Sequence, residues 1–200
     1  PMHLIRLSLA TYRMRRVLRI GDAISDMVVA TRGITAGSGT ATTEMRIMMI
    51  DIVDQALEQF PCVDPTLYVD DLSAEVAGPS EWIEANLAGF IRSACNGIKA
   101  AGGEVSATKS VCTASSPSLT HKITAQLGAF GIQPVVRAKS LGFGMAAGIR
   151  RSAIVINKRL KAYKKRLPRF QMLKQAGVDT NRLNRTGGTA ALVWGQEALG

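Results

Sequence analysis

The sequence has no uncharged apolar run of the roughly 18 residues that a membrane-spanning helix needs. Its N-terminal stretch has arginines within its apolar part and no small-residue cleavage site, so it does not resemble a signal peptide. The three cysteines are scattered, and none shares a metal-ligand spacing with another cysteine or with a histidine. We therefore expect an intracellular protein with reduced thiols, no membrane partner and no zinc site.

Disordered chains are low in apolar residues, and this chain is not, because 46% of its residues are hydrophobic. A length of 200 residues corresponds to one domain, or to one domain with a small appendage. The chain begins at Pro1 and leads directly into a helical pattern. We therefore expect a fragment that starts within a larger fold.

Acidic residues are almost absent between Arg150 and Arg185, where Asp179 alone opposes twelve lysines and arginines and leaves a net charge of +11. Such a segment attracts a polyanion, usually a nucleic acid. Aromatic residues there are sparse (Tyr163 and Phe170), so phosphate contact is expected rather than base stacking. A solvated helix face and a helix lying on a membrane surface remain alternatives.

Hydrophobic periodicity predicts a mixture of helices and short strands. The expected helices cover residues 3–20, 44–60, 81–101, 116–131, 149–167, 169–176 and 189–198, and the expected strands lie within 26–34, 67–69, 72–76, 101–114 and 134–145. Gly21 is expected to end the first helix, Thr42 or Thr43 to cap the second, and Pro168 to stop the basic helix. This order indicates an α+β domain followed by a small helical bundle.

Boundaries and burial can also be predicted for three of these helices. Ser80 is expected to cap the helix over 81–101, whose apolar stripe, including Trp82 and Phe90, should be buried. Ser116 or Ser118 should start the next helix. The basic helix over 149–167 should also have one buried stripe opposite its charged face.

Two adjacent acids, Asp70 and Asp71, interrupt the apolar stretch "TLYVDDLSAEV" at residues 66–76. The stretch predicts two strands that reverse direction at the acid pair. Two carboxylates at such a turn can bind a divalent cation through oxygen, as Mg²⁺ prefers. They suit two-metal phosphoryl transfer, in which ions about 3.5 to 4 Å apart activate the attacking hydroxyl and stabilise the leaving oxygen. An ordinary turn that contains two aspartates is the alternative.

The motif "YVDD" between apolar flanks resembles the metal-binding hairpin of reverse transcriptases, and the neighbouring segments occur in the same order. "RGITAGSGTATT" resembles the Gly-rich template and nucleotide loop, "KAAGGEVSATKSV" the segment after the following helix, and "RAKSLGFGM" the primer-grip hairpin. The basic helix and "ALVWGQEALG" resemble the thumb and tail of non-LTR retrotransposon enzymes. The resemblance implies a partial polymerase palm in residues 1–148, with a small antiparallel sheet and packed helices, and a basic helical thumb in residues 149–200.

The resemblance also implies residue roles around the acid pair. Asp70 and Asp71 would be catalytic and would bind Mg²⁺ or Mn²⁺, and Tyr68 would touch the template–primer near its growing end. Gly33 and Gly37 would let the backbone approach the incoming nucleotide and the template, which glycine permits because it lacks a side chain.

Further along the chain, the implied roles concern phosphates and the primer. Lys109 would lie near the triphosphate, and Leu141 and Gly142 would shape the primer grip. The residues of the basic helix that would follow the nucleic-acid phosphates are Lys158, Lys161 and Lys165. The implied partners are an RNA template, a DNA primer and deoxynucleoside triphosphates, and a nuclear location is implied by the resemblance alone.

The sequence departs from the reverse transcriptase pattern at two places. Ala36 stands where the family has a glutamine, and residues 1–32 contain no counterpart of the strand that carries another catalytic aspartate. The fingers are missing as well. We therefore expect these residues alone not to polymerise. The alternative is a degenerate, non-catalytic nucleic-acid-binding domain.

Overall fold

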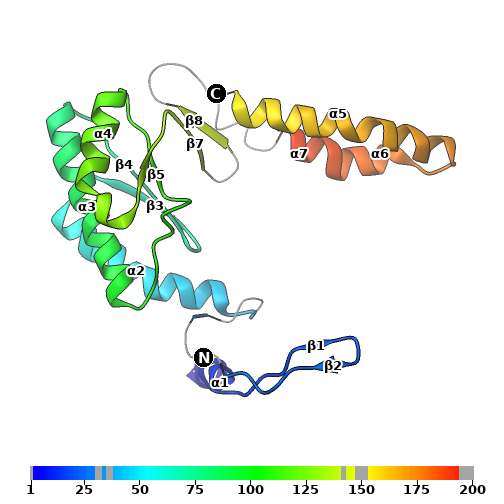
Figure 1. Cartoon of the computed structure of the whole chain (residues 1–200), viewed down its shortest axis with the longest axis horizontal. Coiled ribbons are helices and arrows are strands. Elements are labelled where there is room, and N and C mark those ends of the chain that lie inside the picture. Colours follow the sequence, from blue (N-terminus) through cyan, green and yellow to red (C-terminus); the bar gives the residue numbers. More distant parts are fainter. Residues whose placement is uncertain (1, 30–32, 35–37, 141–142, 147–152, 194–200) are drawn as a thin grey trace. The chain divides into compact units, whose positions relative to one another are not determined.

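A computed structural model describes residues 2–29, 33–34, 38–140, 143–146 and 153–193 (Figure 1). The chain divides into two compact units, residues 1–105 and residues 106–200. Helices combined with two-stranded sheets confirm the predicted α+β class. The predicted boundary between residues 148 and 149 lies inside the second unit and remains a prediction. Within the described ranges, no helix is both long enough and apolar enough to cross a bilayer.

The first unit is built around two long helices and a β-hairpin. Its elements are α1 (Met2–Tyr12), β1 (Arg19–Ile20), β2 (Ala23–Ile24), α2 (Ala41–Gln59), β3 (Asp64–Tyr68), β4 (Asp71–Glu75) and α3 (Ser80–Ala100). The core contains Val53 and Ala56 from α2 and Phe90 and Ala94 from α3, and Leu72 of β4 packs against it. The hairpin β3–β4 is therefore anchored to the helix pair through one of its faces.

Glycines on α3 allow α2 to pack closely against it. A Cβ atom on Gly89 would lie 2.3 Å from Cζ of Phe60, and one on Gly97 would lie 2.7 Å from Cγ2 of Ile52. Real Cβ atoms do not approach other atoms so closely, so the separation of the helices depends on the missing side chains. Phe90 has no exposed surface and belongs to the core against which Ile52 and Phe60 pack.

The predicted helix over residues 3–20 is wrong in its second half. α1 ends at Tyr12, and the chain then folds into the hairpin β1–β2. Its two-residue turn begins at Gly21, which has a φ of +62°. This left-handed conformation suits the tight turns of hairpins. Gly21 therefore reverses the chain, whereas the sequence pattern suggested that it ends a helix.

The predicted strand over residues 26–34 is also wrong within the described residues. Of this range, Val28 alone makes a β-contact, an antiparallel bridge to Arg16. The register shifts by one residue between this bridge and β1–β2, where Arg19 pairs with Ile24. Such a shift is a bulge, which interrupts regular strand pairing.

Helix α2 starts earlier than predicted. Its first residue is Ala41 and its N-cap residue is Thr40, so Thr42 and Thr43 lie inside the first turn. The Thr40 hydroxyl lies 2.9 Å from the Ser38 hydroxyl and makes no capping hydrogen bond to the helix. Side-chain capping, on which the prediction relied, is not what starts this helix.

Helix α3 agrees with its predicted range to within one residue. The predicted cap at Ser80 is wrong, because Ser80 is the first helical residue and Pro79 occupies the N-cap position. The predicted burial of Trp82 is wrong, because this side chain is 40% exposed. Its ring instead covers Gly78, where an added Cβ would lie 2.8 Å from the Cε3 atom of Trp82. The ring therefore packs on the turn that precedes the helix.

The second unit contains short strands, one medium helix and a long basic helix. Its elements are β5 (Val111–Cys112), α4 (Pro117–Gln126), the 3₁₀ helix η1 (Gly128–Phe130), β6 (Gln133–Pro134), β7 (Arg137–Ser140), β8 (Phe143–Ala146), α5 (Ile154–Gln175), α6 (Thr180–Leu183), the π-helix η2 (Asn184–Thr189) and α7 (Ala190–Val193). β5 and β6 pair in parallel, and β7 and β8 form an antiparallel hairpin. Of the two arrangements expected within residues 134–145, a strand pair or a strand and a turn, the structure has the pair.

The start of α4 confirms a capping prediction. The Oγ atom of Ser116 accepts a hydrogen bond of 3.2 Å from the backbone N–H of Leu119, which satisfies one of the unpaired donors at a helix start. Gly131 ends the helical segment in a left-handed conformation, with a φ of +69°. The apolar residues buried along α4 and η1 are Leu119, Ile123, Leu127 and Phe130.

Helix α5 does not stop at Pro168, because it continues to Gln175 with the proline inside it. The predicted separate helix over 169–176 is therefore the last part of α5. Proline removes one backbone donor and clashes with the preceding turn. The neighbouring lysines, arginines and leucines are strong helix formers, and the exposed surface of α5 lets water reach the carbonyl group that loses its partner.

The predicted buried stripe of the basic helix is also wrong. No described residue of α5 is buried, and Leu160 and Leu167 are 37% and 38% exposed. Helix α5 packs on the segment formed by α6, η2 and α7, where the Tyr163 hydroxyl donates a 2.9 Å hydrogen bond to Oδ1 of Asn184. That segment starts before the predicted helix over 189–198, of which the described residues extend to Val193.

Candidate functional site

Hairpin β3–β4 confirms the predicted strand reversal (Figure 1), although the turn lies at Val69–Asp70, one residue before the predicted position. Its register pairs Leu67 with Leu72 and Tyr68 with Asp71. Directly opposed residues of antiparallel strands lie on the same face of the sheet. Because Leu72 packs against the core, Tyr68 and Asp71 lie on the outer face. Tyr68 is 60% exposed, and Asp71 is also exposed.

Val69 and Asp70 form the two-residue turn between the strands. Val69 has a φ of +58° and is the one non-glycine residue of the described chain with a positive φ. For a β-branched residue this conformation is strained, at a cost of about 1–3 kcal/mol, and such strain is concentrated at functional sites. The turn places exposed Asp70 at the tip of the hairpin, directly before Asp71.

The acid pair suits a hard cation in its chemistry but offers few ligands. Mg²⁺ is commonly bound by one or two carboxylates together with water and substrate phosphates. Asp70 and Asp71 supply two exposed carboxylates and fit this requirement. Across the described part of the chain, no group of three or more His, Cys, Asp or Glu side chains could hold a metal ion. The pair therefore has no third carboxylate beside it among these residues.

The other predicted site residues fall in both units. Gly33, in the first unit with the acid pair, is exposed and has a φ of +86°, which favours glycine. Lys109 is an exposed residue of the second unit, in a turn where its N–H donates to the Ser106 carbonyl at 3.2 Å. Gly37 lies outside the described residues. So do Leu141 and Gly142, which lie between β7 and β8 in the sequence.

The basic face of α5 consists of exposed side chains. The helix carries eight basic residues and no acidic residue. Lys158, Lys161 and Lys165 are exposed, and their spacing of three and four residues places them on one face. Arg169 continues this row, which then spans about 16 Å at 1.5 Å per residue. The sequence prediction missed Arg169 because it ended the helix at Pro168. The four-residue spacing from Lys165 to Arg169 was the signal that could have found it.

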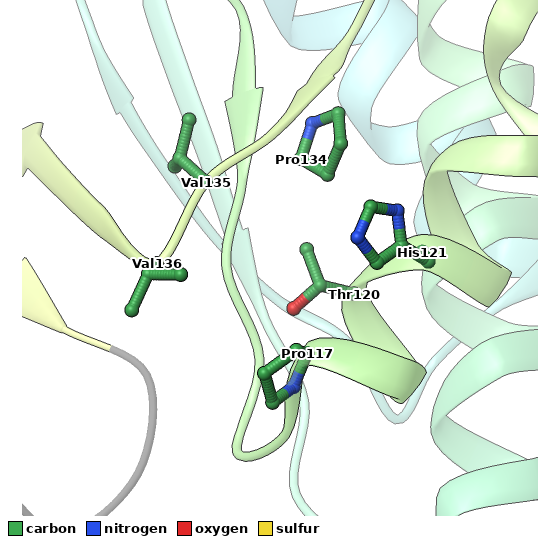
Figure 2. Close-up of a pocket in the computed structure, with 6 residues that line it drawn as sticks. All are labelled: Pro117, Thr120, His121, Pro134, Val135 and Val136. Atoms are coloured by element: carbon green, nitrogen blue, oxygen red, sulfur yellow. The ribbon is translucent and has the colours of Figure 1, made fainter.

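A small pocket in the second unit was not predicted from the sequence. It is lined by Pro117, Thr120 and His121 of α4 and by residues 134–136, as Figure 2 shows. The Thr120 hydroxyl already donates a 3.1 Å hydrogen bond to the Ser116 carbonyl. His121 is the one ionisable group in this largely apolar lining. The pocket contains none of the predicted site residues.

Two of the three cysteines are poor candidates for a nucleophile. Burial raises the pKa of the Cys95 thiol, although Lys99 partly opposes this effect, and burial also raises the pKa of the Cys112 thiol. A thiol must be deprotonated to act as a nucleophile. Both groups are therefore poorly suited to catalysis at neutral pH.

Comparisons of the sequence with protein-family models and with curated proteins, and of the structure with solved structures, gave no match. Any functional assignment must therefore start from the acid hairpin and the basic helix themselves.

Proposed function

We propose that this chain is part of a reverse transcriptase, an RNA-directed DNA polymerase of the non-LTR type. The observation that carries the proposal is the geometry of β3–β4. Its tight turn exposes Asp70 at the tip, and its last strand pair exposes Asp71 beside Tyr68 on the outer face. The inner face is anchored to α2 and α3 through the core, so the two carboxylates project from a rigid support. In this proposal the hairpin belongs to a partial palm and α5 to a thumb.

In the proposed reaction, a primer hydroxyl attacks a deoxynucleoside triphosphate and pyrophosphate leaves. Asp70 and Asp71 would hold Mg²⁺, or Mn²⁺, which supplies the positive charge that phosphoryl transfer needs. Tyr68 shares the outer face with Asp71 and would contact the template–primer beside the reacting end. Gly33, with its left-handed backbone, would allow close approach of the nucleotide.

The exposed basic row on α5 supports the nucleic-acid part of the proposal. Its lysines and Arg169 meet no acidic residue on their own helix. Such a row can follow the phosphates of an RNA template paired with a DNA primer without reading their bases. Lys109 would assist near the triphosphate.

A second candidate is a degenerate domain that binds nucleic acid without catalysis. It is favoured by the acid pair having no third acidic, histidine or cysteine ligand within the described residues. The exposed basic helix fits this candidate equally well, because phosphate binding needs no metal site. Activity measurements separate the two candidates.

The test is Mg²⁺-dependent primer extension by the full-length protein and by its Asp70→Asn variant. Because the metal supplies several kcal/mol of transition-state stabilisation, losing a ligand should lower the extension rate by at least about a hundredfold. Asp64→Asn is the matched control, since Asp64 is an exposed aspartate at the opposite end of the same hairpin. It should keep wild-type activity.

Equal extension by wild type and Asp70→Asn would contradict the catalytic assignment. A wild-type protein that binds primer–template tightly but extends no primer would favour the second candidate.

A further inference from the structure

The turn of hairpin β3–β4 contains a residue that is poorly suited to its backbone conformation. Of the two central residues of the turn, Val69 has a φ of +58°, whereas Asp70 has no positive φ. A positive φ at the first central residue alone is typical of a type II′ turn, in which glycine is preferred at that position. The chain thus has a β-branched side chain where glycine would adopt the same turn without strain.

The strand pairs next to the turn hold Val69 in this conformation. Tyr68 pairs with Asp71, and Leu67 pairs with Leu72, which packs against the core of the first unit. These pairs leave two residues for the reversal, so the backbone of Val69 cannot relax unless the last pair separates. A strained conformation persists only where the surrounding structure enforces it. Here the anchored hairpin enforces it.

The conformation of Val69 sets the direction of Asp70, because the two residues share one planar peptide bond. A branched side chain excludes most backbone conformations that glycine can adopt. A glycine at this position could exchange between type I′ and type II′ turns, both of which have a positive φ at the first central residue. Such an exchange would turn the exposed carboxylate of Asp70 in different directions relative to that of Asp71.

We infer that Val69 is a positioning residue, which lowers the stability of the hairpin but holds the Asp70 carboxylate in one orientation beside Asp71. Val69 needs no contact with a substrate in this role. Mg²⁺ demands a nearly octahedral arrangement of its ligands, so a carboxylate that is already fixed loses less conformational freedom when it binds the ion. The inference rests on the proposed function, because the orientation of Asp70 affects a reaction only in that proposal.

The first test measures whether Val69 is strained. Val69→Gly should raise the midpoint of thermal unfolding of the 200-residue chain by about 2–4 °C, because relief of strain outweighs the extra freedom of glycine in the unfolded chain. Val136→Gly is the matched control, since Val136 is an exposed valine without a positive φ, and it should lower the midpoint. A midpoint that Val69→Gly leaves unchanged or lowers would overturn the inference.

The second test measures the motion of Asp70 by ¹⁵N relaxation, without any assay of activity. Order parameters report motion up to nanoseconds, and relaxation dispersion reports exchange over microseconds to milliseconds. In wild type the Asp70 amide should have an order parameter of about 0.85 and no dispersion. In Val69→Gly it should have either an order parameter below about 0.6 or clear dispersion. An Asp70 amide that is equally rigid in both proteins would overturn the positioning role.

The third test measures primer extension by the full-length protein. Val69→Gly should lower kcat by about tenfold, because the metal ligand is less well oriented, and should leave KM for the primer–template unchanged. Val69→Ile keeps a branched side chain and should keep the wild-type kcat. A variant that is more stable and yet slower cannot owe its loss of activity to unfolding.

The third test also separates the inference from the proposed function. A wild type that extends primers while Val69→Gly keeps the wild-type kcat would overturn the positioning role alone. A wild type that extends no primer would overturn the proposed function together with the catalytic consequence of the turn. The unfolding midpoints and the relaxation of Asp70 would still decide whether Val69 is strained and fixes the turn.

Discussion

Helices α3 and α5 are almost equal in length, with 21 and 22 residues, but they are stabilised in different ways. Helix α3 buries four residues and packs on α2 through glycines. Helix α5 buries none, carries eight basic residues and packs along one side on α6 and α7. The first helix thus supports the acid hairpin, while the second exposes Lys158, Lys161, Lys165 and Arg169. Substitutions in α3 should change stability, and those in α5 should change binding.

The largest effect is expected from Phe90→Ala in α3. Phe90 has no exposed surface and lies in the core that anchors β4. Truncation should lower the free energy of unfolding by about 3–5 kcal/mol, through lost burial and a cavity. Urea denaturation measures the change. Leu160→Ala is the counterpart on α5, where the side chain is 37% exposed and the cost should be about 1–2 kcal/mol. Similar losses in the two variants would contradict the contrast between the helices.

A smaller effect is expected from Gly89→Ala, also in α3. Alanine is normally favoured over glycine in a helix by about 1 kcal/mol. Here its Cβ would lie 2.3 Å from Cζ of Phe60. Overpacking should therefore give a net destabilisation of about 1–2 kcal/mol, measured by thermal unfolding. The control is Gly128→Ala, because a Cβ there meets nothing within 4 Å. Stabilisation by Gly89→Ala would show that the Phe60 ring can move aside at little cost.

The smallest effect on stability is expected from charge reversal on α5. Replacing Lys158, Lys161 and Lys165 with glutamate should change the free energy of unfolding by no more than about 0.5 kcal/mol per site, because all three are exposed. Binding to primer–template should weaken. The slope of log affinity against log salt concentration should fall by about 2 to 3, since each lost phosphate contact removes 0.7 to 0.9.

Lys122→Glu is the control for this experiment, because Lys122 is an exposed lysine on α4. Its effect on the salt slope should be small. An unchanged slope in the triple variant would mean that the basic face of α5 faces solvent and binds no nucleic acid.

Predictions from the sequence succeeded where several local signals agreed. Alternating residues, a turn and flanking prolines together predicted β3–β4 with the acids at its reversal. The cap at Ser116 and the stop at Gly131 marked the segment that contains α4. Predictions failed where one local signal had two meanings. Gly21 can end a helix or reverse a hairpin, and Pro168 can stop a helix or be tolerated within an exposed one.

The sequence by itself determined where the two carboxylates lie and where the positive charge gathers. Side chains alternate between the two faces of a strand, so the sequence shows which hairpin residues share a face. The segment of positive charge is read directly from its lysines and arginines. Tertiary structure decided that Trp82, Leu160 and Leu167 stay exposed, that Gly89 and Gly97 receive side chains of α2 and its C-terminal cap, and that Tyr12 reaches Glu44. These features join residues far apart in the chain. Local patterns do not encode such contacts, because they form only when separate elements pack against each other.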